Sequence, residues 1–94
     1  MLNDNNDFYK RLEKQLSLSS AWPSVYKFKF ILKSNSLNIA NLKNIFNDID
    51  ADFSSNYSSS NNFTSITIIA MMKSANEVIK KYKLASEIEG IISL

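Results

Sequence analysis

Two stretches of alternating apolar and polar residues, each followed by a segment with helical spacing, constrain the fold of this chain most strongly. The alternation runs through Ser24–Lys33 and again through Phe63–Lys73. A period of two residues is typical of a strand that buries one face and exposes the other. Each stretch therefore predicts a strand, and the residues that come after it predict a helix.

In both predicted strands one face is more apolar than the other, and we expect this face to be buried. Aromatic residues dominate it in the first strand and aliphatic residues in the second, as suits a pleated sheet packed on one side. The two buried faces are Tyr26, Phe28, Phe30 and Leu32, and Ile66, Ile68, Ala70 and Met72. The strong pattern of the second strand predicts a central place in the sheet.

Apolar residues recur at helical spacing after each of these strands. The first series is Ile39, Leu42, Ile45, Phe46 and Ile49, and the second is Ala75, Val78, Ile79, Tyr82 and Ala85. Each series predicts an amphipathic helix with one buried face. Ser74 and Glu77 have the spacing of a capping box that begins the second helix. Its lysines, Lys80, Lys81 and Lys83, are predicted to form a solvated face.

Two weaker strands complete the predicted sheet. Asp52–Ser60 is polar and irregular, which favours an edge strand, and Asn61-Asn62 then supplies a hairpin turn. Ile91–Leu94 predicts a short last strand after Gly90. The order is strand, helix, strand, strand, helix, strand. We therefore predict an α+β, ferredoxin-like β-α-β-β-α-β domain over residues 21–94, with a four-stranded antiparallel sheet and two helices on one face.

Residues 1–20 are predicted to form an N-terminal helical extension. Phe8, Leu12 and Leu16 recur every four residues on one face, and Asp4 or Asp7 is expected to cap the helix. Ser17–Ala21 is expected to link the helix to the domain. Such a helix is marginal alone, so it must dock against another surface or fray.

Composition removes most of the chemistry that a small domain can perform. The 94 residues include no Cys and no His, which excludes thiol nucleophiles, Ser-His-Asp triads and His zinc sites. Asp48, Asp50 and Asp52 resemble the start of a calcium loop, but Phe53 and Ser59 stand where the loop needs Gly and Glu. We predict no catalytic residue, no metal site and no cofactor.

The chain begins with a polar, acidic segment, Met1–Asp7, that lacks the pattern of a secretory signal. Its longest apolar run lies around Ile66–Met72 and is far shorter than the roughly 20 residues that a membrane-spanning helix needs. Together with the lack of Cys, these features favour a cytoplasmic protein that does not interact with a membrane.

Three segments, Trp22–Phe30, Ser65–Ile68 and Ile88–Ile92, resemble the YbeD-like family of small bacterial proteins, whose function is unassigned. The resemblance covers roughly residues 20–94 and rests on strand and turn patterns. It implies the ferredoxin-like fold. It also implies a similarity of shape to ACT-type regulatory domains, which sense small ligands, usually as dimers.

The chain departs from these patterns in two turns. Asn61-Asn62 stands where relatives commonly carry Gly in the hairpin before the central strand. Ser34-Asn35-Ser36 forms the loop in which ACT domains that bind amino acids typically place a Gly. The second departure weakens the expectation of amino-acid sensing.

The face of the sheet opposite the helices is predicted to be the interaction surface. It comprises Val25, Lys27, Lys29, Ile31, Ser65, Thr67, Ile69 and Met71. Such a face is more apolar than solvent usually tolerates, so the N-terminal helix, a second copy of the chain or another protein should cover it. We predict a non-enzymatic regulatory or protein-interaction module, with a small ligand possible in the manner of ACT domains.

The alternative function is RNA binding through the same face. RNA-recognition domains share this strand order and stack bases on aromatic residues of their central strands. Here only Phe63 could stack, with Lys27 and Lys29 for the phosphates, and the net charge is only +2. Nucleic acid is therefore the less favoured partner.

Overall fold

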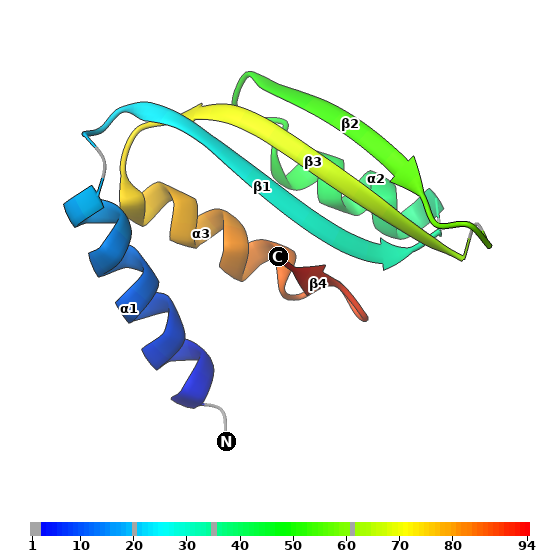
Figure 1. The fold of residues 1–94 in the computed structure, drawn as a ribbon, viewed down its shortest axis with the longest axis horizontal. Helices are drawn as coiled ribbons and strands as arrows, with labels where there is room; N and C mark the ends of the chain where they lie inside the picture. Colours follow the sequence, from blue (N-terminus) through cyan, green and yellow to red (C-terminus); the bar gives the residue numbers. More distant parts are fainter. Residues whose placement is uncertain (1–2, 20, 35, 61) are drawn as a thin grey trace.

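The computed structural model describes residues 3–19, 21–34, 36–60 and 62–94 (Figure 1). Within them, one sheet of four antiparallel strands has the order β2-β3-β1-β4. Its strands are β1 (Ser24–Lys33), β2 (Ala51–Tyr57), β3 (Phe63–Met72) and β4 (Ile92–Ser93). The helices of the described chain are α1 (Asn3–Ser19), α2 (Ser36–Ile45) and α3 (Ala75–Ala85). The fold is thus α+β and compatible with the predicted ferredoxin-like arrangement.

The centre of the sheet is the long antiparallel pair of β1 and β3. Its register runs without interruption from Ser24 opposite Met72 to Lys33 opposite Phe63. The prediction for β1 is confirmed at both ends, and β3 ends one residue before the predicted Lys73. β2 pairs with the outer side of β3 and forms one edge, as predicted.

The core lies between the sheet and helices α2 and α3, and it is built around aromatic rings. The ring centroid of Phe28 lies 4.9 Å from that of Phe46 on one side and 5.2 Å from that of Tyr82 on the other. Both predicted inner strand faces are buried, except that Tyr26 is half-buried. All five residues of the predicted buried stripe of α3 are buried as well. Burial of this apolar surface, at roughly 25 cal/mol per Å², is the main force that holds the layers together.

Several predicted boundaries are wrong by a few residues. β2 ends at Tyr57 instead of Ser60. β4 is only Ile92–Ser93, because the chain turns at Gly90, with φ +78°, and Ile91 still lies outside the sheet. α1 continues to Ser19, through the segment predicted to be a link. Asn35 and Asn61 of the two predicted turns lie outside the described residues.

The N-terminal helix α1 packs beside α3 and leaves the opposite face of the sheet uncovered (Figure 1). It begins at Asn3, so Asp7 lies inside the helix and does not cap it. Tyr9, Leu12 and Leu16 contact the core, whereas Phe8 is 53% exposed. The predicted stripe is therefore wrong at its first residue: α1 docks on α3 so that the ring of Tyr9, and not that of Phe8, packs against the core.

Candidate protein-binding face

All eight residues of the predicted interaction surface lie together on the side of the sheet opposite α2 and α3. Their register forms four cross-strand pairs, because odd-numbered residues of β1 oppose odd-numbered residues of β3. The pairs are Val25 with Met71, Lys27 with Ile69, Lys29 with Thr67, and Ile31 with Ser65. We call this surface the open face.

One end of the open face carries exposed apolar side chains. Val25 is 61% exposed, Met71 58% and Ile69 41%. Together with Asp50 and Asp52 they line a shallow hollow of about 220 Å³. We call Val25, Ile69 and Met71 the apolar corner. Exposed apolar side chains that adjoin one another in this way are typical of protein-binding surfaces.

The sequence reasoning missed an acidic border on the same face. β2 pairs with β3 so that Asp52 is opposite Ile69, and Ser54 is opposite Thr67. Asp52 therefore continues the row that begins with Lys27 on β1. The hairpin between β2 and β3 is the sequence feature that indicates this alignment, because the length of its turn fixes the register of the two strands.

Charge is divided across the open face, with lysines on β1 and carboxylates on the opposite side of β3. Among the described residues, Lys27, Lys29, Asp50 and Asp52 form no ion pair within the chain. Lys27 and Asp52 are separated by two strand spacings, about 9.6 Å. The chain thus leaves charges of both signs exposed on either side of an apolar centre.

The other end of the open face is lined by Ile31, Phe63 and Ser65, together with Asn56, Tyr57 and Ser58, around a hollow of about 310 Å³. Phe63 is 44% exposed and lies opposite Lys33. This is the aromatic side chain that the RNA hypothesis requires.

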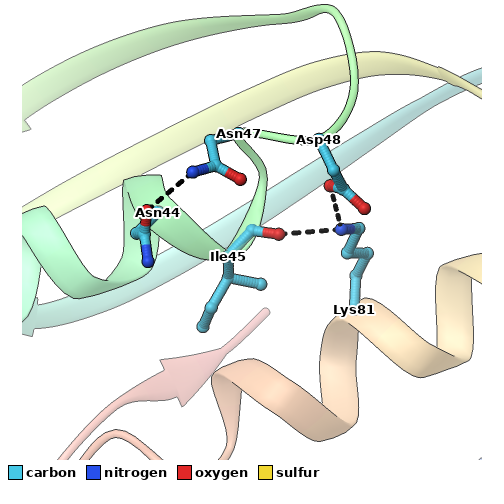
Figure 2. Close-up of polar contacts among 5 residues, drawn as sticks. All are labelled: Asn44, Ile45, Asn47, Asp48 and Lys81. Carbon is cyan, nitrogen blue, oxygen red and sulfur yellow. Dashed lines mark hydrogen bonds and ion pairs between the residues drawn. The ribbon is translucent and has the colours of Figure 1, made fainter.

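Lys81 corrects the prediction of a fully solvated lysine face on α3. Its side chain is only 7% exposed, and its Nζ donates to Oδ1 of Asp48 at 2.6 Å and to the carbonyl of Ile45 at 2.7 Å (Figure 2). The Ile45 carbonyl is at the C-terminal end of α2, where helix carbonyls lack intrahelical partners. The hydrogen bond from Lys81 and the attraction of its charge hold the pKa of Asp48 below its usual value. This site stabilises the packing of α3 against α2.

The carboxylates that resembled a calcium loop do not converge. Asp48 binds Lys81, whereas Asp50 and Asp52 line the hollow of the open face. Among the described residues there is no group of three side chains able to hold a metal ion. Asp50 and Asp52 are thus border residues of the open face.

A further apolar cavity, of about 250 Å³, lies between α1 and the end of the chain. It is lined by Phe8, Tyr9 and Leu12 of α1, Tyr26, Tyr82, Ser93 and Leu94. The hydroxyls of Tyr26 and Tyr82 form a hydrogen bond of 2.9 Å there. Burial, with the hydrogen bond to Tyr26, raises the pKa of Tyr82, so this phenol stays neutral.

Comparison with known proteins returns no match among family models, curated proteins or solved structures. The resemblance to the YbeD-like family thus stays a prediction. Within the described ranges, no helix combines the length and the apolar character needed to cross a bilayer. The chain is an α+β protein with helices on one side of its sheet and an open face on the other.

Proposed function

We propose that this protein is a non-enzymatic regulatory module with a ferredoxin-like, ACT-like fold, and that its open face binds another protein chain. The observation that carries the proposal is the apolar corner, where Val25, Ile69 and Met71 are all exposed at one end of the open face. α1, one of the three candidates for covering this face, instead packs on α3.

The cavities support protein binding over the sensing of a small ligand. Ligand pockets usually measure about 300–1,000 Å³. The cavity beside Tyr26 and Tyr82 measures about 250 Å³ and the hollow at the apolar corner about 220 Å³. The hollow beside Phe63, about 310 Å³, reaches only the lower end of that range. A broad surface with charges at its border suits a protein partner better than these cavities suit a ligand.

The charge distribution also favours protein over RNA. Single-stranded nucleic acid is held by positive charge together with aromatic rings on which bases stack. On the open face Asp50 and Asp52 adjoin the apolar corner, and they would repel phosphates. The variant Lys27→Glu, Lys29→Glu tests this alternative: loss of affinity for a single-stranded RNA, measured by fluorescence anisotropy, would favour RNA binding.

The direct test is site-specific photo-crosslinking in the cells from which the protein comes. Benzoylphenylalanine replaces Ile69 on the open face or, as a control, Leu84 on α3. The two positions are matched in exposure, at 41% and 48%. A discrete crosslinked product from position 69 and none from position 84 would support the proposal. Equal products from both positions, or none from position 69, would contradict it.

A further inference from the structure

One row of the open face is self-complementary in charge about the line of β3. One cross-strand row consists of Lys27 on β1, Ile69 on β3 and Asp52 on β2. The basic and acidic members lie about 4.8 Å on either side of the central residue. Rotation by 180° about an axis along β3 therefore exchanges the positions of the two charges.

We propose that the partner of the open face is a second copy of this chain, bound face to face with a two-fold axis along β3. This inference rests on the proposed function, because it names the occupant of the same surface. In the dimer Lys27 of each copy faces Asp52 of the other, so two ion pairs form by symmetry. Ile69 and Met71 lie near the axis and pack against their own counterparts.

Other two-fold arrangements of the same two faces lack this match. An axis across the strands places β1 over β1, so that lysines face lysines. An axis between β1 and β3 places Lys27 over Ile69 of the other copy and leaves Asp52 outside the central overlap. Like charges opposed at an interface disfavour an arrangement, whereas complementary ones select the register. The charge pattern thus selects the axis along β3.

The available area sets the expected strength of the dimer. A strand of ten residues is about 33 Å long, and three strands are about 15 Å wide, so each copy offers roughly 500 Å² of flat surface. The two copies together bury about 1,000 Å², at the lower limit for a specific interface. Stacked sheets cross at about 30°, so the axis runs about 15° from β3, and residues one strand spacing from the axis shift by only about 2.5 Å relative to the residues that they face. We therefore expect a reversible dimer with a Kd in the micromolar range.

The test is a charge exchange between two variants, Lys27→Asp and Asp52→Lys. Each variant alone places like charges opposite each other twice in the dimer. Sedimentation equilibrium should show self-association weakened by about tenfold or more in each. An equimolar mixture of the two should associate again. In the mixed dimer the Asp introduced at position 27 of one chain faces the Lys introduced at position 52 of the other. The unchanged Asp52 of the first chain faces the unchanged Lys27 of the second. The double variant should also dimerise.

Two exposed residues away from the face supply matched controls. Lys14→Asp on α1 and Glu87→Lys after α3 change the net charge by the same amounts. Both controls should dimerise as the wild type does. Circular dichroism of all variants verifies that each is folded, which is expected because Lys27 and Asp52 are exposed and have no ion-pair partner among the described residues.

Three outcomes would overturn the inference: a wild type that stays monomeric to about 1 mM, single variants that associate like the wild type, or a mixture that fails to associate. The crosslinking experiment separates this failure from that of the proposed function. A product at position 69 that contains a different protein would leave the proposed function intact and remove the homodimer. A product with the mass of two copies supports both.

Discussion

Nζ of Lys81 lies 2.6 Å from Oδ1 of Asp48, so that an ion pair connects α3 to the turn that follows α2. The two side chains differ strongly in burial, with Lys81 7% exposed and Asp48 67%. The buried ammonium therefore depends on the Ile45 carbonyl as well as on the carboxylate. This contact should have measurable effects on the stability of the protein.

Lys81→Met should destabilise the protein by about 1–3 kcal/mol, because the Ile45 carbonyl loses its donor while the aliphatic volume is largely kept. The measurement is the free energy of unfolding in urea. Lys80→Met is the matched control, since Lys80 is exposed and pairs with Glu77 on the same helix. The control should change stability by less than about 0.5 kcal/mol. Equal effects of the two substitutions would contradict a structural role for Lys81.

The pH dependence of stability should reveal the same pair through Asp48. Its pKa is lower in the folded protein than in the unfolded chain, so its ionised form stabilises the fold above the unfolded pKa, about 3.9. This contribution is lost as the pH falls through the lower, folded pKa. The wild type should thus be more stable than Asp48→Asn at pH 6, with a gap that closes on acidification below about pH 4.

Unfolding titrations at several pH values provide that measurement, and the control is the same substitution in the Lys81→Met background. Without the ammonium, Asp48→Asn should leave no gap that depends on pH. A gap that persists there would assign the effect to another group.

The hydroxyl pair of Tyr26 and Tyr82 predicts a non-additive result. Tyr82→Phe and Tyr26→Phe should each cost about 1 kcal/mol, because each leaves one hydroxyl without its partner. The double variant should cost less than the sum, since both polar groups are then removed. Thermal unfolding measures all three, with Tyr57→Phe as a control at an exposed position. Additive losses would show that the hydrogen bond contributes nothing.

Docking of α1 should depend on Leu12 and not on the residues of the exposed face of α1. Leu12→Asn places an amide against the core surface on which Leu12 packs, which should release α1 from α3. Hydrogen exchange should then increase in α1 while the amides of β1 and β3 stay protected. Leu18→Asn, at a position 79% exposed, should leave exchange unchanged. Loss of protection in the sheet as well would mean that α1 and the sheet unfold as one unit.

The faces of β1 and β3 were predictable because they follow from a period of two that the backbone itself imposes. Phe28 and Ile68 alternate with exposed neighbours, and any strand with this pattern buries the same side. The buried stripe of α3 followed equally from its period. Lys81 departs from the predicted solvated face because it lies three residues after Val78 and four before Ala85, on the inner side of the helix. The charge of Lys81 favours a solvated side chain, but its helical spacing correctly indicates a buried one.

By itself, then, the sequence determined the elements, the inner side of each central strand and the lack of Cys and His chemistry. The tertiary structure decided what each outward side chain meets. Whether Phe8 or Tyr9 turns inward depends on where α1 docks, because both fit a helical stripe with Leu12 and Leu16. The alignment of Asp52 with Ile69 and Lys27 depends on strand pairing. Periodicity is a local property of the backbone, whereas docking and pairing arise from contacts between segments that are distant along the chain.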